Sequence, residues 1–382
     1  MWTFNLRFIC PAFLGDAEQK SELRTPPIKW LLRHWWRVCY AANQGYTGDV
    51  SAMRADEHRL FGAATGGADG NGGQSRVRIR IGKWRAGSLG AAAWENLPPV
   101  MHPEVNHGQA VPADLYLGYG PVINARGGAR PTTLKSGAAI HAGEQVELRI
   151  ALDPRVGESF QIEQQRIARA LALMNLYGTL GGRGRNAWGS FVLEPFADQA
   201  SLATPTPTRD WEQCLGLDWP HAIGQDAKGP LVWASHPVAN WKLAMNMMAR
   251  LRLGMRTQFM FARGKTPTPE PRHWLAYPAG AAHQVTTWGR EARLPNSLRL
   301  RLRASPDGLR VVAFHMPALP PPAFAAMLHR AQIVDTWQAV HSLLDQLALP
   351  AAARTYPRVA NAARNADITN MLDGIALTRS AQ

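Results

Sequence analysis

The chain has 382 residues, 46% of them hydrophobic and 18% charged, and a formal net charge of +14 at pH 7. Single hydrophobic cores usually stop growing below this length, so we expect two domains. The charged residues are few but strongly biased toward lysine and arginine, which indicates a polyanionic partner. Three isolated cysteines exclude a disulfide framework, and no apolar run is long enough for a membrane-spanning helix. We therefore expect a cytoplasmic protein without a membrane partner.

The first half of the chain has the pattern of one mixed domain. Its periodicities predict, in chain order, a strand over 2–9, a helix over 27–42, strands over 75–81 and 145–152, a helix over 162–177 and a strand over 188–193. This order, βαββαβ, is that of a ferredoxin-like or RRM-type domain, which we place at 1–200. The stretch at about 83–142 has no clear periodicity and is interpreted as an insertion. A glycine-rich loop lies between the second helix and the last strand.

The second half of the chain is less regular. Its apolar patterns predict strands near 229–235, 273–277, 283–288, 298–304 and 309–316, and helices over 238–253 and 323–347. A Thr- and Pro-rich piece at 203–210 is typical of a stiff linker, which we extend over 201–228. We interpret residues 229–382 as a second ferredoxin-like domain with a C-terminal helical extension. The predicted fold class is therefore α+β, with two ferredoxin-like domains in tandem.

The predicted helix over 27–42 carries a cationic stripe beside an apolar one. At about 100° per residue, Lys29, Arg33 and Arg37 fall on a single arc, and Arg24 comes just before the helix. No Asp or Glu stands four residues from any of the three. Like charges on one face repel unless an anion neutralises them, although such a stripe is commonly just the solvated side of a helix. We favour a site for RNA phosphates.

The glycine-rich loop is the second candidate site. Its residues with a predicted role in RNA binding are Gly181, Gly182, Arg183, Gly184, Arg185 and Asn186. Glycines allow backbone N–H groups to approach phosphates, and arginines add charge-assisted hydrogen bonds. No Gly-Lys-Ser/Thr follows, so the loop is not a nucleotide-hydrolysing P-loop. The plainer alternative is a flexible surface connection.

Aromatic residues in polar surroundings are candidates for base stacking or for a subunit interface. They are Trp30, His34, Trp84 and Trp94. Three other tryptophans are predicted to be core residues, namely Trp35, Trp36 and Trp188. Two sets of alternating arginines complete the candidates, Arg76, Arg78 and Arg80 in the first half and Arg299, Arg301 and Arg303 in the second. These sets fit the wet face of an antiparallel sheet, RNA contact or an acidic neighbouring subunit equally well.

Four sequence blocks, taken in order, resemble a known family. They read CPAFLGDA at 10–17 with ELRTPPIKWLLRHWWRV at 22–38, RLFG at 59–62 with QSRVRI at 74–79, YGTLGGRGRNAWGSF at 177–191, and RHWLAYP at 272–278 with LRLRLRASPDG at 298–308. The order and spacing are similar to those of the large RAMP-superfamily subunit counted first in the type III-B, or Cmr, CRISPR effector complex. The chain departs from that family's pattern at Pro27, Trp30, His34 and Ala187, where Ser, Gly, Phe and Gly are usual.

The resemblance implies a non-catalytic RNA-binding subunit of a CRISPR ribonucleoprotein for antiviral defence. Such a subunit would contact the 3′ region of the guide (CRISPR) RNA and help capture complementary target RNA. The expected partners are guide RNA, target RNA and the other RAMP subunits. We expect no cofactor and no metal, because no metal-ligand spacing is present. One alternative is a metal-independent endoribonuclease that processes CRISPR precursor RNA with His34 as general base; another is a scaffold that meets only protein neighbours.

Overall fold

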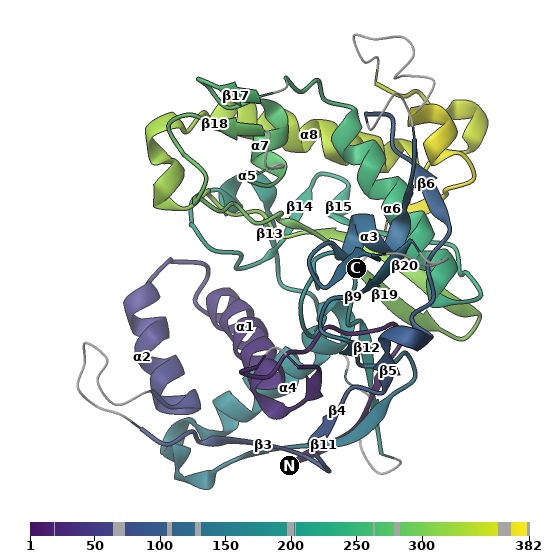
Figure 1. Cartoon of the computed structure of the whole chain (residues 1–382). Coiled ribbons are helices and arrows are strands. Elements are labelled where there is room, and N and C mark those ends of the chain that lie inside the picture. The colour runs from purple at the N-terminus through teal and green to yellow at the C-terminus, as the bar shows by residue number, and fades with distance from the viewer. Residues whose placement is uncertain are drawn as a thin grey trace. The chain divides into compact units, whose positions relative to one another are not determined.

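The computed structural model divides the chain into two compact units (Figure 1). Unit 1 comprises residues 1–94 and 133–207, and unit 2 comprises residues 95–132 and 208–382. The structure describes residues 1–18, 20–63, 73–104, 109–126, 131–196, 202, 204–262, 264–278, 283–357 and 368–379. Helices and antiparallel sheets occur in both units, so the predicted α+β class is confirmed.

Unit 1 is built on a four-stranded antiparallel sheet in the order β12-β1-β11-β3. Its main elements are β1 (Trp2–Phe8), α1 (Thr25–Asn43), α2 (Val50–Phe61), β3 (Val77–Ile81), β11 (Gln145–Leu152), α4 (Phe160–Tyr177) and β12 (Phe191–Pro195). Its short elements are β2 (Glu22–Leu23), β4 (Arg85–Ala86), β5 (Leu89–Gly90), η1 (Ala91–Ala93), β10 (Ala138–Ala139) and η2 (Pro154–Ser159). The first five predicted elements differ from the observed bounds by at most two residues. The last strand begins at Phe191, so residues 188–190 belong to the loop.

The core of unit 1 lies between one face of this sheet and the helices α1 and α4, which pack side by side. Alternation along β1 buries Phe4, Leu6 and Phe8 on the helix side of the sheet. From α1, Trp35 and Trp36 are both fully buried, as predicted. Burying a large apolar side chain contributes about 1.5–3 kcal/mol, so these residues fix α1 on the sheet.

Unit 2 contains a second four-stranded antiparallel sheet, in the order β19-β20-β16-β21. Its main elements are β16 (Val232–Ser235), α6 (Trp241–Thr257), β19 (Leu298–Ser305), β20 (Gly308–His315), α8 (Arg330–Gln346) and β21 (Leu377–Arg379). The others are β6 (Pro99–Met101), β7 (Ala110–Pro112), α3 (Ala113–Gly118), β8 (Val122–Asn124), β13 (Thr208–Asp210), α5 (Trp211–Cys214), β14 (Ile223–Asp226), β15 (Gly229–Pro230), β17 (Gly264–Thr266), α7 (Pro271–Leu275), β18 (His283–Val285), η3 (Pro322–Met327) and η4 (Ala351–Ala353). The strand β9 (Thr132–Leu134) spans the boundary between the two units.

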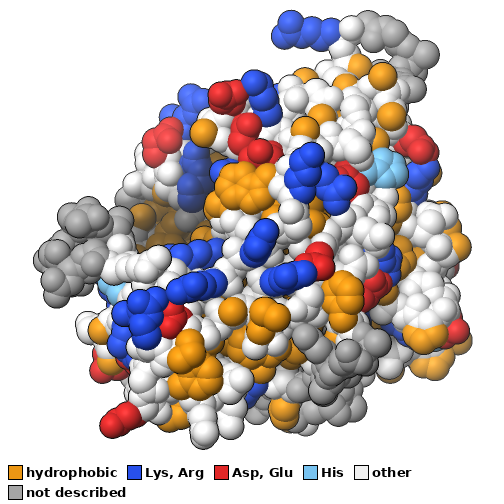
Figure 2. Space-filling model, turned by 90° about the horizontal axis from the view of Figure 1, so that it is seen from below, with side chains coloured by type: hydrophobic (Ala, Val, Ile, Leu, Met, Phe, Trp, Pro, Cys, Tyr) orange, Lys and Arg blue, Asp and Glu red, His pale blue; other side chains and the backbone are white. Residues whose placement is uncertain are grey.

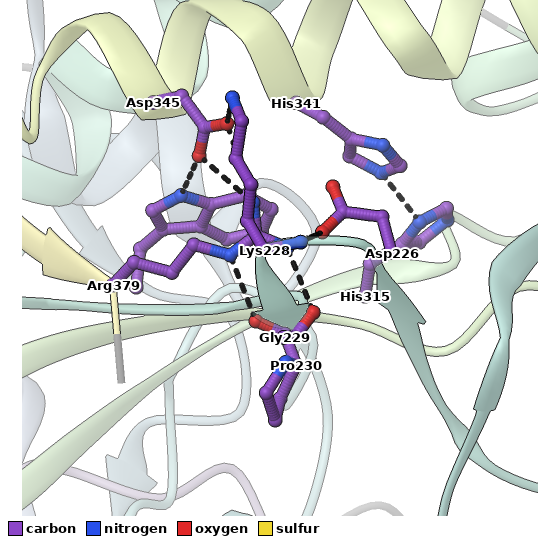
Figure 3. Close-up of polar contacts among 9 residues, drawn as sticks. Asp226, Lys228, Gly229, Pro230, His315, His341, Asp345 and Arg379 are labelled. Carbon is purple, nitrogen blue, oxygen red and sulfur yellow. Dashed lines mark hydrogen bonds and ion pairs between the residues drawn. The ribbon is translucent and has the colours of Figure 1, made fainter. Parts of the chain in front are cut away.

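The short strand β21 is fixed at the edge of its sheet by one arginine (Figure 3). Arg379 donates to the carboxylates of Asp226, at 2.5 Å, and Asp345, at 3.2 Å. It also donates to the carbonyl oxygens of Gly229 and Pro230. Charge-assisted hydrogen bonds are stronger than neutral ones. They explain how β21, with only three residues, stays paired at the edge of the sheet. The sequence pattern predicted only a helical extension for this end of the chain.

Four other expectations change. The predicted strand at 273–277 is wrong, because a proline and a Glu270–His273 capping box begin α7 there. Much of the predicted linker at 201–228 is folded, since β13 pairs with β14 in parallel and α5 buries Trp211. Residues 95–132 of the predicted insertion group with unit 2. Arg301 is only 1% exposed, so β19 does not present a wet row of three arginines.

Candidate RNA interface

The helix α1 places the cationic stripe on the surface of unit 1. Arg24 is extended, and two prolines fill the first turn, where the missing N–H groups would have no partner within the helix. The apolar side of the helix is buried on the core, and Lys29, Arg33 and Arg37 remain partly exposed. The predicted separation of apolar and cationic stripes is therefore present in the structure.

The spacing within the helix had indicated a stripe without acidic partners, but the structure places a carboxylate beside it. Glu57 reaches it from α2 and is 3% exposed. Its Oε1 accepts from Arg33 Nε at 2.8 Å and from Arg37 Nε at 2.9 Å, and its Oε2 accepts from Arg37 Nη2 at 2.8 Å. One carboxylate thus neutralises one of two guanidinium charges and holds both in place. The inference from unpaired charges is wrong for Arg33 and Arg37.

Lys29 and Arg24 differ in their surroundings. Within the described residues, no carboxylate lies within ion-pair distance of Lys29. Partial burial, and secondly the nearby Arg33, lower the pKa of Lys29, so an anion that bound here would relieve both effects. Arg24 donates from Nη2 to the carbonyl oxygen of Gly15, and thereby ties the segment before α1 to the segment after β1.

The aromatic candidates divide into exposed and buried residues. Trp30 is 65% exposed and Trp84 is 50% exposed. The ring of His34 lies nearly parallel to that of Trp30, at 9° with a centroid distance of 6.1 Å. Trp94 is 1% exposed and packs 5.7 Å from Trp188, so the expectation that it is available for stacking is wrong.

The glycine-rich loop has a defined conformation. Arg183 and Ala187 have φ angles of 57° and 71°, and Gly189 has a φ of 72°. A Cβ on Gly189 would lie 1.9 Å from the carbonyl oxygen of Leu180. The loop is also bonded to the segment after β1, where Gly182 N–H donates to the Phe13 carbonyl oxygen at 2.8 Å. These contacts hold the loop against the segment after β1.

The tip of the loop faces solvent. Gly181, Gly182, Arg183 and Arg185 are exposed, whereas Asn186 is buried at 8% exposure. Within the part of the chain that the structure describes, the backbone N–H of Arg185 donates to no acceptor. The arginines and this N–H group can therefore meet an anion, while Asn186 is better placed to hold the loop.

The loop and α1 lie at the same end of the unit 1 sheet. The loop connects α4 to β12, and α1 follows β1, the antiparallel neighbour of β12. At the base of the loop, a Cβ on Gly178 would lie 2.9 Å from the side chain of Leu31 on α1. The two sequence blocks that predicted RNA contact are thus brought together, although 140 or so residues separate them.

The opposite face of the sheet also carries arginines. Figure 2 shows Lys and Arg side chains in a broken row on the side of the molecule where Figure 1 draws β3 and β11. Arg78 pairs with Asp153 at 2.9 Å, Arg149 pairs with Glu147, and Arg7 pairs with Glu194 (2.5 Å). These pairs neutralise much of the row. This face is consistent with the wet side of a sheet.

No protein-family model and no curated protein matches the chain. Its fold is similar to those of chains in solved structures. One belongs to the type III-B Cmr-beta complex bound to cognate target RNA and AMPPnP, in the presence of ssDNA; it is 10% identical, with 89% of this chain and 99% of that chain covered and a TM-score of 0.44. A chain of Cmr-beta bound to cognate target RNA is 10% identical, with 87% and 98% covered and a TM-score of 0.42.

Cmr1 from Pyrococcus furiosus, in its apo form, is 14% identical, with 84% of this chain and 89% of that chain covered and a TM-score of 0.39. Among the described residues, no helix is long and apolar enough to cross a membrane, and no group of three or more His, Cys, Asp or Glu residues is arranged to hold a metal ion.

The surface formed by α1 and the glycine-rich loop can bind a polyanion. It combines cations that point to solvent with an exposed aromatic ring, the two features that single-stranded nucleic acid engages. Sequence reasoning missed Glu57, the residue that fixes the stripe. Its position two residues before the RLFG block, on a helix capped by Asp49, is the signal that could have placed a carboxylate near α1.

Proposed function

We propose that the chain is a RAMP subunit of a type III-B Cmr effector complex and binds RNA through unit 1. Four ordered sequence blocks support this assignment, and the fold agrees with it. In each unit the main elements follow one another along the chain as βαββαβ. Within each four-stranded sheet, the first of these strands lies between the third and the fourth. This shared order supports two ferredoxin-like domains in tandem.

The observation that carries the RNA-binding role is the meeting of α1 and the glycine-rich loop at one end of the unit 1 sheet. The phosphate-binding residues of this proposal are Lys29, Arg183 and Arg185, whose side chains are accessible. Arg33 and Arg37 contribute one net positive charge after Glu57 is counted. Contacts of this kind bind the phosphate backbone of the RNA. Recognition of the RNA sequence then depends on base pairing between guide and target.

The guide RNA, the target RNA and the other subunits of the complex are the partners in this proposal. We place the chain at the 3′ region of the guide, as the sequence resemblance implies. We also propose that the subunit is not catalytic. His34 packs between Trp30 and Trp35, with centroid distances of 6.1 and 5.2 Å, which supports an aromatic packing role for its imidazole.

A salt titration tests the proposal. The full chain is mixed with a labelled single-stranded guide-like RNA in EDTA, and binding is measured by fluorescence anisotropy at several salt concentrations. We expect the wild type to bind with a marked salt dependence, and the double variant K29A/R185A to bind more weakly with a salt slope reduced by about 1.4, or 0.7 for each lost phosphate contact. Lys135→Ala, an exposed lysine of unit 1, is the matched control.

The same samples are run on denaturing gels. Intact RNA supports the non-catalytic role, and discrete products that disappear in His34→Ala would establish the endoribonuclease instead. RNA binding that is equal in the wild type, K29A/R185A and Lys135→Ala would contradict the proposed surface. An absence of salt-dependent binding would favour the scaffold.

A further inference from the structure

Trp30 is an exception among the apolar residues of α1. Ile28, Leu31 and Leu32 on either side of it are at most 4% exposed, whereas Trp30 is 65% exposed. A single exposed apolar residue needs no explanation by itself. Trp30, however, is held in a defined arrangement with a second ring and stands among the cations of the stripe. These two observations require an explanation for its exposure.

The second ring is that of His34, one helical turn further on. The two rings are separated by 6.1 Å between centroids and lie within 9° of parallel. His34 in turn contacts the buried Trp35 edge-on, at 5.2 Å. The core therefore supports His34, and His34 supports one face of Trp30. The exposed fraction of Trp30 leaves its other face available to a planar partner.

The cations define what that partner is. Lys29 adjoins Trp30 in the chain, and Arg33 follows one turn later on the same side of the helix. These two side chains place positive charge beside the exposed ring, and Glu57, which also bonds Arg37, balances only part of it. A flat aromatic surface beside two cations matches a nucleotide, with its base on the ring and its phosphate on the side chains.

We propose that Trp30, backed by His34, is the stacking platform for one unpaired nucleobase of bound RNA. This inference rests on the proposed function, and adds a base-dependent contact to a surface that otherwise holds phosphates. The family that the sequence resembles has glycine at this position, so the platform is a feature of this chain. Stacking is tolerant of base identity, so we expect little preference among the four bases.

The test compares two short probes of equal length, an oligouridine and a ribose-phosphate chain that lacks bases. Affinities of the full chain are measured by competition against a labelled RNA. We expect Trp30→Ala to bind oligouridine about 5- to 150-fold more weakly than the wild type, which is the range measured for loss of one base–aromatic stack. Its affinity for the baseless probe is expected to be unchanged. Trp30→Phe should retain most of the difference between the probes.

Tyr119→Ala removes an aromatic ring of unit 2 that is 65% exposed, the same fraction as Trp30, and is the matched control. Equal binding of oligouridine by wild type and Trp30→Ala, with the salt dependence intact, would overturn the stacking site and leave the RNA-binding role standing. An equal loss on both probes would also overturn it, because Trp30 would then act through packing or a protein contact. If the wild type binds neither probe, the proposed function fails together with this inference.

Discussion

The Glu57→Gln substitution should change stability and RNA binding in opposite directions. Glu57 is 3% exposed and accepts three hydrogen bonds from two arginines whose side chains are 30% and 39% exposed. Glutamine keeps the shape of the side chain but removes its charge, and its amide group turns a donor toward one arginine. The variant thus loses charge-assisted bonds around a buried acceptor.

The magnitude follows from these contacts. Breaking a fully buried ion pair costs about 3–5 kcal/mol, and exposed pairs contribute at most about 1 kcal/mol. Because the carboxylate is buried and both guanidinium groups reach solvent, we expect a loss of about 2 kcal/mol in the free energy of unfolding of unit 1. Urea denaturation followed by tryptophan fluorescence measures it. Glu194→Gln breaks the more exposed pair with Arg7 and should cost about 1 kcal/mol or less.

RNA affinity should rise in the same variant, provided that it is measured under folding conditions. Removal of Glu57 leaves both guanidinium charges of the stripe without an acid, which strengthens attraction to phosphates and steepens the salt dependence. Anisotropy titrations at several salt concentrations measure this. A stable Glu57→Gln variant, or one that is folded but binds RNA more weakly than the wild type, would refute the assigned role of this carboxylate.

Three further predictions concern the loop and unit 2. Gly189→Ala should destabilise unit 1 by at least about 2 kcal/mol in urea denaturation, because of its φ of 72° and the clash with a carbonyl oxygen, whereas Gly82→Ala has open space and should not. Arg185→Ala should weaken RNA binding without a change in the urea midpoint, and a shifted midpoint would assign it a structural role. Burial lowers the pKa of His341 to about 3 and that of His315 well below its ordinary value, so unfolding free energy should fall as pH drops below about 6.5, by up to ~1.4 kcal/mol per pH unit for each histidine.

The pH prediction follows from the sign of proton uptake. Between the lowered folded-state pKa and the unfolded-state value, the unfolded chain binds more protons, so its population grows as pH falls. The two imidazoles are hydrogen-bonded to each other at 2.9 Å (Figure 3). A double variant at these positions that keeps the fold should show a shallower pH dependence between about pH 4 and 6.5. An unchanged slope would contradict the neutral buried pair.

The sequence predicted the sheet of unit 1 and both helices that cover it, because one buried face produces a regular alternation in strands and a regular stripe in helices. It also identified α1 and the glycine-rich loop as a pair of candidate sites. The local hydrophobic pattern was therefore sufficient to predict those helices and strands that bury only one face.

Contacts between distant segments were not predictable in the same way. Glu57 neutralises residues 20 and 24 positions away on another helix, so the search for acids within α1 did not find it. The strand β21 has three residues and depends on Arg379, whose hydrogen-bond partners lie in three other elements, β14, β15 and α8. Trp94 stands among polar neighbours in the chain, yet it is buried through ring contacts with Phe13 and Trp188.

Photo-crosslinking tests the central claim most directly. The full chain is bound to a single-stranded RNA that contains 4-thiouridine, irradiated, digested and analysed by mass spectrometry. The account predicts crosslinks in the peptides that carry Trp30 and His34 and in those from 178–190, and their loss at high salt. Crosslinks confined to unit 2, or to the arginine-bearing strands β3 and β11, would contradict an RNA interface formed by α1 and the glycine-rich loop.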